Sequence, residues 1–422
     1  MCLLDIKGFL YFRKFYIKNI QLLIWCSKLG SVKVCEDIFW VGVDDQRDIL
    51  FEGLWPIPNG VSYNAYIVKG SEKIALIDTV DEFYSKEFLS NIEEIVKCSE
   101  IDYIVLNHLE PDHSGSLNQV LKRAPRAKVV SSQMGINFAK AYYGEGFEAM
   151  AVKDGDIIDL GGHALKFIAA PWLHWPETIF TYDINSETLF SGDAFGTFGA
   201  LNGKIFDDEI SIKDFEDDMK RYFADIVSHY SQFVLKAAEK IKNISIKVLC
   251  TTHGPIYRKN PDVPIKLYLK WSSGVDENKI LILYGSMYGH TAEVAKYFED
   301  RIRAMGVNVK LFDLCRVHPS FILPELIDCK AVLLGSPTYE GTIYPPITNL
   351  IEYARIKNIR QKSFGIFANY TWGSNIIEQL KSKLVEIGMR IVEPTVLVKG
   401  RFTEDDKGKA DLLIENVIKT MS

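Results

Sequence analysis

The chain has 422 residues, of which 47% are hydrophobic and 25% are charged, a composition typical of a soluble globular protein. Its length exceeds what one hydrophobic core usually supports, so at least two domains are expected. A formal net charge of -6 at pH 7 offers no basic surface for nucleic acid or for an anionic membrane. We therefore expect neither as a partner.

Seven cysteines are scattered along the sequence without a C-x-x-C pair. Their odd number and wide spacing argue against disulfides and favour a reducing, cytoplasmic location. They also exclude a thiolate-ligated zinc or iron module, which needs clustered cysteines. Residues 1–31 form an apolar extension that basic residues interrupt. It has neither the ~20 uncharged residues of a membrane span nor the order of a signal peptide, and no role is predicted for it.

Residues 32–256 mix short strands with helices, and this density predicts an αββα sandwich, in which helices cover two sheets. The pair Gly161-Gly162 predicts a hairpin between strands 157–160 and 165–169. Ser114 is expected to cap a helix over 114–121. The other predicted strands span 38–43, 49–55, 63–68, 73–77, 101–106, 128–131, 178–182, 188–190 and 247–251, and the other helices span 83–96 and 214–242.

A loop rich in metal-binding side chains follows the strand 101–106 and reads N-H-L-E-P-D-H-S-G. Residues two apart in an extended segment point to the same side. His108, Glu110 and Asp112 can therefore converge, while His113 turns towards a neighbouring point. Clustering buried charge without a counter-ion is costly. Four such side chains in six positions predict two metal ions side by side.

Three more loops carry candidate ligands, each where a predicted strand gives way to Gly or Pro. The combined loops supply four histidines and three carboxylates, enough for two ions that share a bridging carboxylate. The predicted ligands are His108, Glu110 and His174 for one ion, Asp112, His113 and His253 for the other, and Asp193 as the bridge.

The types of ligand narrow the choice of metal. Imidazole and carboxylate without thiolate suit iron or manganese as well as zinc. Glu110 is the informative position, because an additional oxygen donor favours a redox-active iron over zinc. The isolated histidines His163, His229 and His318 are interpreted as hydrogen-bonded bystanders.

Residues 257–278 are rich in Pro, Lys, Ser and Gly and are predicted to link two domains. From residue 279 to 422, strands and helices alternate regularly, which predicts a doubly wound parallel five-stranded sheet. The predicted strands span 279–284, 308–314, 331–335, 363–368 and 390–398, and the helices span 291–305, 321–327, 347–354, 376–388 and a last one from 404.

The first strand of this second domain runs into G-S-M-Y-G-H-T, and a helix follows. Free N–H groups and the dipole make such a helix terminus an anion site. The loop lacks the lysine of a nucleoside-triphosphate loop, and it is not the G-x-G-x-x-G of a dinucleotide site. A single phosphate of a mononucleotide fits better. The residues predicted to surround it are Ser286, Met287, Tyr288, Gly289, His290 and Thr291.

Two further loops flank the same crevice if the strand order is 2-1-3-4-5. Both offer backbone hydrogen bonds and aromatic rings that can lie against a flat heterocycle, which predicts an FMN site. Their residues are Ser336, Pro337, Thr338, Tyr339, Glu340 and Gly341 in one loop, and Ala368, Asn369, Tyr370, Thr371, Trp372 and Gly373 in the other.

From about residue 32 the chain resembles the flavodiiron proteins, or A-type flavoproteins. Hydrolase relatives of their first domain carry H-x-H-x-D-H where this chain has H-x-E-x-D-H, so Glu110 separates the two groups. The matching elements are H-x-E-x-D-H at 108–113, H-W-P at 174–176, G-D at 192–193, T-H-G at 252–254 and the phosphate loop at 286–291.

The resemblance implies a metallo-β-lactamase-like di-iron domain joined to a flavodoxin-like FMN domain. Electrons from an external donor, a rubredoxin-like protein or a reduced deazaflavin, would enter at FMN and pass to two iron ions that reduce dioxygen to water or nitric oxide to nitrous oxide. It also implies a head-to-tail homodimer, or a dimer of such dimers, that brings one subunit's FMN to the other's iron. The alternatives are a zinc hydrolase with a flavodoxin-like electron-transfer appendage and a non-enzymatic flavin electron carrier.

Overall fold

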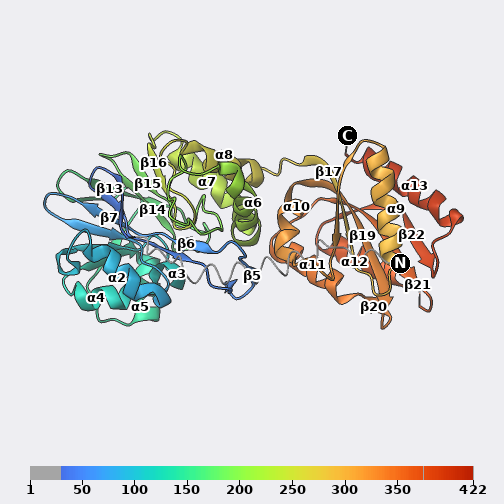
Figure 1. Cartoon of the computed structure of the whole chain (residues 1–422), viewed down its shortest axis with the longest axis horizontal. Helices are drawn as coiled ribbons and strands as arrows, with labels where there is room; N and C mark the ends of the chain where they lie inside the picture. Colours follow the sequence, from blue (N-terminus) through green and yellow to red (C-terminus); the bar gives the residue numbers. More distant parts are fainter. Residues whose placement is uncertain (1–29, 374, 422) are drawn as a thin grey trace, which may run out of the picture.

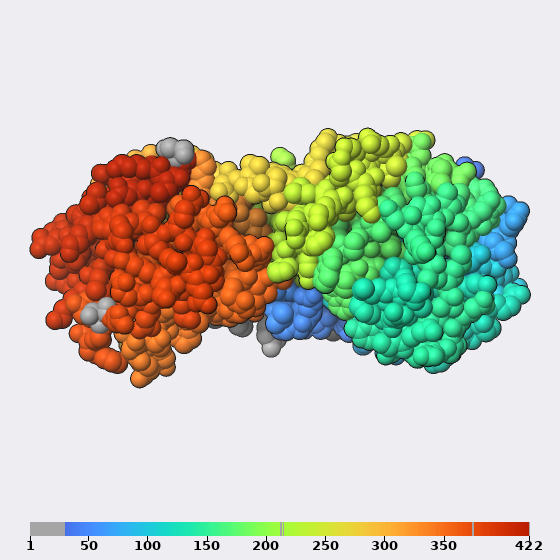
Figure 2. Space-filling view, turned by 180° about the vertical axis from the view of Figure 1, so that it is seen from behind, coloured from blue at the N-terminus to red at the C-terminus, as the bar shows by residue number. Residues whose placement is uncertain are grey.

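The computed structural model describes residues 30–373 and 375–421, which form two domains placed end to end (Figure 1). Between them the molecule narrows to a waist, and the connecting chain runs along its upper edge in both views (Figure 2). Residues 1–29 of the predicted extension lie outside the described residues. In the part that the structure describes, no helix is long and apolar enough to cross a membrane.

The first domain is built on two β-sheets. The seven-stranded sheet has the order β1-β2-β7-β8-β9-β10-β11, and the five-stranded sheet has the order β12-β13-β14-β15-β16. Their strands are β1 (Val32–Cys35), β2 (Ile38–Trp40), β7 (Tyr66–Lys69), β8 (Ile74–Ile77), β9 (Tyr103–Val105), β10 (Lys128–Ser132), β11 (Ala149–Val152), β12 (Ile157–Asp159), β13 (Ala164–Ala169), β14 (Ile179–Asp183), β15 (Thr188–Phe190) and β16 (Val248–Cys250).

Helices cover the outer faces of the sheets, so the predicted αββα sandwich is confirmed (Figure 1). Val105 and Val130 belong to the core between the two sheets, whereas Ile104 and Val129 belong to the core beneath the helices. Because both faces of these strands are buried, apolar residues stand at consecutive positions instead of alternating with polar ones. The helices are α2 (Ser85–Glu93), α3 (Pro111–Ser114), α4 (Leu117–Arg123) and α5 (Gln133–Tyr143) on one side, and α6 (Ile212–Tyr222), α7 (Ser231–Ile241) and α8 (Asp262–Ser272) on the other.

The predicted strand 49–55 is wrong, because the chain turns back within it. Strands β4 (Leu50–Phe51) and β5 (Trp55–Pro56) form a short hairpin. Glu52 and Gly53 make the turn with φ values of 52° and 68°. A glycine suits such a conformation. The apolar residues on both sides of the turn have the pattern of a single strand, so the turn was not predicted. A second two-stranded ribbon pairs β3 (Val43–Asp45) with β6 (Val61–Tyr63).

Two predicted helices also differ from the structure. Ser114 does not cap a helix over 114–121 but ends α3, where its Oγ donates to the carbonyls of Leu109 (2.9 Å) and Glu110 (2.8 Å). The long helix over 214–242 is interrupted by a π-helical turn, Phe223–Val227, which separates α6 from α7.

The second domain is the predicted doubly wound sheet. Its order, β18-β17-β19-β21-β22, is the 2-1-3-4-5 order, and these strands pair in parallel. The strands are β17 (Glu277–Tyr284), β18 (Asn308–Asp313), β19 (Cys329–Tyr339), β20 (Thr342–Ile343), β21 (Ser363–Tyr370) and β22 (Arg390–Lys399), and the helices are α9 (His290–Ala304), α10 (Leu323–Asp328), α11 (Pro345–Ile356), α12 (Ile376–Glu386) and α13 (Glu404–Lys419).

Buried polar contacts join the two domains. Lys220 of α6 pairs with Asp328 of α10 at 2.5 Å, and Arg221 Nη1 donates to Ser320 Oγ at 3.2 Å. Ser320 Oγ in turn donates to Asp225 Oδ2 at 2.5 Å, while the other oxygen of Asp225 is buried without a partner among the described residues. Burial raises the pKa of Asp225 to about 8, against the lowering contributions of Ser320 and Arg221.

Thermal stability is expected to fall as the pH rises from about 4 to about 8. The unfolded chain releases the proton of Asp225 near the ordinary pKa, whereas the folded chain holds it until about 8, so ionisation opposes folding across this window. The loss should reach a few kcal/mol. Asp225→Asn should flatten this part of the Tm–pH profile, and Asp208→Asn, which changes an exposed ion pair, should leave the slope as it is.

Candidate functional site

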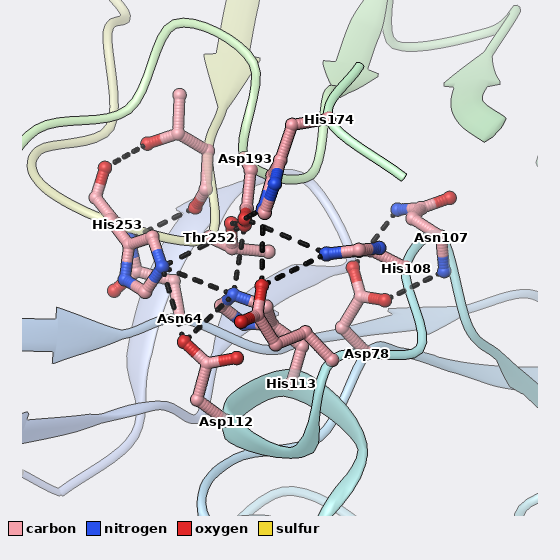
Figure 3. Close-up of polar contacts among 12 residues, drawn as sticks. Asn64, Asp78, Asn107, His108, Asp112, His113, His174, Asp193, Thr252 and His253 are labelled. Atoms are coloured by element: carbon pink, nitrogen blue, oxygen red, sulfur yellow. Dashed lines mark hydrogen bonds and ion pairs between the residues drawn. The ribbon is translucent and has the colours of Figure 1, made fainter. Parts of the chain in front are cut away.

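All seven predicted metal ligands meet at one end of the first domain, and Figure 3 labels them apart from Glu110. They form two groups, and within each group the potential ligand atoms lie within 4.8 Å of one another. The first group contains His108, Glu110, His174 and Asp193, and the second contains Asp112, His113 and His253.

The first loop divides its side chains between the two groups by starting a helix. Glu110 precedes α3, and Pro111 fits its first position, where its missing N–H costs nothing. Leu109 is fully buried, which anchors the loop. Glu110 extends towards His108 and His174, with Oε2 at 3.2 and 3.1 Å from their Nε2 atoms.

The other loops leave β13, β15 and β16 at the same end of the domain. Asp193 follows Gly192, whose φ is 57°, and His253 precedes Gly254, whose φ is 84°. A Cβ at Gly254 would lie 2.1 Å from Thr197 Cγ2, so only glycine fits this turn. His174 follows Trp172, a non-glycine residue with φ of 65°.

Asp193 lies between the two groups and turns one oxygen towards each. Its Oδ2 is 3.1 Å from His174 Nε2 and 3.8 Å from His108 Nε2. Its Oδ1 is 2.8 Å from His113 Nε2 and 3.7 Å from His253 Nε2. This is the geometry of a carboxylate that bridges two adjacent ions, as expected for two-metal sites.

The carboxylates of the site favour positive charge beside them. Burial alone lowers the pKa of His174, but Asp193 and Glu110 outweigh it and raise that pKa to about 9. For His113 burial is likewise outweighed by Asp112 and Asp193, and the pKa is about 9. Both oxygens of Asp112 are buried without a hydrogen-bond partner among the described residues, a costly state that a bound ion relieves. The side chains present therefore fit a pair of metal ions.

A second layer of contacts orients the histidines. Glu177, which is 2% exposed, accepts from His108 Nδ1 at 2.7 Å and from the Leu109 amide at 3.0 Å. The Ser62 carbonyl accepts from His253 Nδ1 at 2.8 Å. Each contact fixes the tautomer that leaves Nε2 free to bind a metal. Sequence reasoning missed Glu177, although it stands three residues after His174 in the same loop.

Other buried side chains stabilise the ligand loops through hydrogen bonds. Thr252 Oγ1 donates to Asp193 Oδ1 at 2.6 Å. Asp78 accepts from the backbone N–H of Asn107 at 2.7 Å and from its side-chain amide at 3.0 Å (Figure 3). These contacts hold the strand ends in place before any metal binds.

Glu177→Gln is expected to weaken metal binding by about 10- to 100-fold without unfolding the chain. Glutamine keeps the shape but loses the charge that stabilises the His108 N–H as a donor. Competition with a chelator would measure the metal affinity. Glu187→Gln, at a carboxylate that bonds Ser245 near the surface, is the matched control and should bind metal as tightly as the unchanged protein. Equal affinity in both variants would contradict the orienting role.

The three predicted flavin loops also meet at one edge, the carboxyl ends of β17, β19 and β21. Gly289 precedes α9 with φ of 97° and has no side chain that could cap the helix, while Ser286 Oγ accepts from the Ala292 N–H at 3.4 Å. Ser286 Oγ accepts from the Gly289 N–H at 3.1 Å, and Thr291 is buried at the helix start. Tyr288 is 89% exposed at the rim.

The other two loops stand side by side. Pro337 pairs with Asn369 in the parallel register, and Thr338 Oγ1 lies 3.5 Å from the Asn369 carbonyl and 3.4 Å from that of Gly373. Trp372 is 65% exposed. These loops lie where the strand order reverses, between β17 and β19, the usual position of a nucleotide in this fold. The geometry fits FMN, with its phosphate at the helix and its ring between the loops.

For each residue of the three flavin loops, contact with the flavin remains a prediction. In the phosphate loop they are Ser286, Met287, Tyr288, Gly289, His290 and Thr291, and in the flanking loops they are Ser336, Pro337, Thr338, Tyr339, Glu340, Gly341, Ala368, Asn369, Tyr370, Thr371, Trp372 and Gly373. The bystander histidines lie elsewhere: His163 pairs with Asp183, and His229 Nδ1 contacts the Ile356 carbonyl.

Comparison with known proteins gives matches along both domains. Residues 61–254 match the ODP family beta lactamase model and residues 282–411 match the flavodoxin model. A nitric oxide reductase of Moorella thermoacetica is 33% identical over 86% of this chain and 92% of its own length. An anaerobic nitric oxide reductase flavorubredoxin of Aliivibrio salmonicida is 31% identical over 89% of this chain and 76% of its own.

Solved structures resemble the whole described chain. The rubredoxin oxygen:oxidoreductase from Desulfovibrio gigas superimposes with a TM-score of 0.89 at 28% identity, covering 93% of this chain and 98% of that one. A flavo di-iron protein variant from Thermotoga maritima gives a TM-score of 0.86 at 31% identity, with the same coverage.

Proposed function

The chain belongs to the flavodiiron protein family, and we propose that it reduces dioxygen to water, nitric oxide to nitrous oxide, or both. It is an oxidoreductase, and its cofactors are FMN and two iron ions. Relatives named as a nitric oxide reductase and as an oxygen oxidoreductase both match it over most of their length.

The observation that supports the proposal most strongly is the shared carboxylate Asp193, with one oxygen turned to each ligand group. A carboxylate placed in this way would hold two ions side by side. When bound, the flavin and the iron pair would supply the redox chemistry for reduction of the gas. We propose His108, Glu110, His174, Asp112, His113, His253 and Asp193 as the residues that hold the iron.

The chain itself orients the ligands and excludes water. Glu177 holds His108, and the rings of Phe51, Tyr63 and Tyr222 pack around His253 with centroids 5.4, 5.8 and 5.4 Å from its own. An apolar wall of this kind limits the escape of reactive species from the site.

The partners are part of the proposal. We propose an external electron donor, a rubredoxin-like protein or a reduced deazaflavin. We also propose a head-to-tail homodimer, alone or in pairs, in which a second subunit's flavin domain faces the metal ligands. An apolar cavity of about 410 Å³ supports this: Trp175 lines it together with Phe138 and Tyr142, and its ring lies 5.1 Å from that of His108.

A zinc hydrolase is the second candidate, because the fold of the first domain is shared with hydrolases. Glu110 argues against it: an oxygen donor stands within 3.2 Å of His108 and 3.1 Å of His174, where hydrolases carry a third histidine. Metal analysis of purified protein separates the two, with two irons per chain expected here and zinc expected for the alternative.

Anaerobic reduction of the purified holoprotein, followed by parallel exposure to dioxygen and to nitric oxide, determines which gas is the substrate. Reoxidation of the flavin, with consumption of one gas faster than the other, identifies the preferred substrate. If neither gas reoxidises the flavin, the proposed reaction is wrong.

A further inference from the structure

A polar cavity of about 290 Å³ lies where the two domains meet, away from both predicted cofactor sites. Its walls come from the first domain, from the connecting segment and from the second domain. On the second domain it is lined by residues near the start of β21 and β22, including Lys362 and Arg390. The flavin loops lie at the opposite ends of these strands, so the cavity is separate from the FMN crevice.

The lining is strongly cationic. Four basic residues belong to it, although the Lys357 ammonium lies over the ring of Trp55, and Asp276 is the acidic residue of the lining. Lys362, which is 6% exposed, forms an ion pair with Asp276. Arg390 donates instead to the neutral carbonyl of Gln361, at 2.6 and 3.2 Å. No carboxylate of the described residues lies within ion-pair distance of Arg360, the third basic residue of the lining.

The fourth basic residue, Lys357, follows the carboxyl end of α11, where the helix dipole favours a cation. The helix dipole does not account for Arg360 and Arg390, which lie beyond the helix. Burial lowers the pKa of Lys357, against the opposing contributions of Glu52 and Asp225. Like charges held together against their repulsion are typical of a binding site.

A hydroxyl without a partner lies in the same cavity. Ser272 Oγ, at the end of α8, is buried and makes no hydrogen bond among the described residues. The neighbouring hydroxyls of Ser228 and Ser231 both donate to backbone carbonyls, of Ala224 and Ser228, at 2.8 and 2.7 Å. Ser272 is therefore the serine of this lining whose proton stays available to a ligand.

We propose that this cavity binds a phosphate group, either free inorganic phosphate or the phosphate of a mononucleotide. Arginine guanidinium groups and hydroxyls are the usual partners of phosphate oxygens, and an Arg fork can bind two of them. The volume lies near the lower bound of small-molecule pockets, roughly 300 Å³, which favours a ligand no larger than a mononucleotide. Because the walls belong to both domains, the ligand would stabilise their junction.

Calorimetric titration of the FMN- and iron-loaded protein tests the proposal, because an empty flavin site would itself take phosphate. Inorganic phosphate and AMP are titrated separately at constant ionic strength. We expect saturable binding of one equivalent, weakened at least about tenfold by Arg360→Ala, which removes a charged donor. Tighter binding of AMP than of phosphate assigns the site to a nucleotide, and equal binding assigns it to free phosphate.

The matched control is Arg355→Ala, at an arginine of the last turn of α11 that pairs with Glu352 and does not line the cavity. It should bind like the unchanged protein. Arg360 has no ion-pair partner among the described residues, so its variant is expected to fold, and an unchanged Tm of the ligand-free protein verifies this. Absence of saturable binding for both probes at millimolar concentration, or equal binding by Arg360→Ala, would overturn the proposal.

Discussion

Asp193→Asn is expected to remove the paired metal centre and to lower gas reduction by at least about 100-fold. The change keeps the shape of the side chain, but a neutral amide cannot bridge two cations as a carboxylate does. Loss of groups that merely orient ligands already costs roughly 10- to 100-fold in metal affinity or activity, so loss of the bridge should cost more. Metal analysis after gel filtration should find fewer than two irons per chain.

The flavin content supplies the internal control for this variant. Asp193 lies in the first domain and the flavin loops lie in the second, so FMN should stay bound and remain reducible. Asp208→Asn changes an exposed carboxylate that pairs with Arg258, and it should retain both the irons and the activity. An Asp193→Asn protein with two irons and full activity would show that Asp193 is not the bridge.

Thr291→Asp is expected to abolish FMN binding while leaving two irons per chain. Thr291 is buried at the second position of α9, where the N–H groups face the predicted phosphate. A carboxylate about 4 Å from the phosphate is repelled by roughly 4 kcal/mol per pair of unit charges at an effective dielectric constant of 20. This corresponds to a nearly thousandfold weaker Kd. Quenching of FMN fluorescence on binding to the apoprotein measures it.

Asn349→Asp adds the same charge at an exposed position of α11 and should leave the Kd for FMN unchanged. Thr291→Asp should also stop electron entry from the donor, although the iron content stays normal. FMN bound with unchanged affinity in this variant would place the phosphate elsewhere in the crevice.

Much of the metal site could be predicted because its chemistry is local. The alternation of an extended loop already aims His108 and Glu110 together, and the loops after β13, β15 and β16 leave one sheet at the same end. The same alternation wrongly places Asp112 with His108 and Glu110, because α3 starts at Pro111 and turns Asp112 to the second group. The parallel, doubly wound sheet of the second domain followed from its regular alternation of strands and helices.

Contacts between distant segments could not be predicted in this way. Glu177 acquires its role only when its loop closes over His108, and its single carboxylate has no distinctive spacing. Asp225 meets Ser320 across the two domains, a contact between residues far apart in the chain. The turn at Glu52-Gly53 could not be predicted, because the apolar residues on its two sides have the pattern of a single strand.

Diffraction from crystals of the purified protein at the iron absorption edge is the most direct test of a paired iron centre joined to a flavin. We expect two anomalous peaks, one beside each ligand group with Asp193 between them, and FMN density with its phosphate at Thr291. A single zinc peak, or no metal beside intact ligands, together with an empty crevice at Thr291 would contradict it.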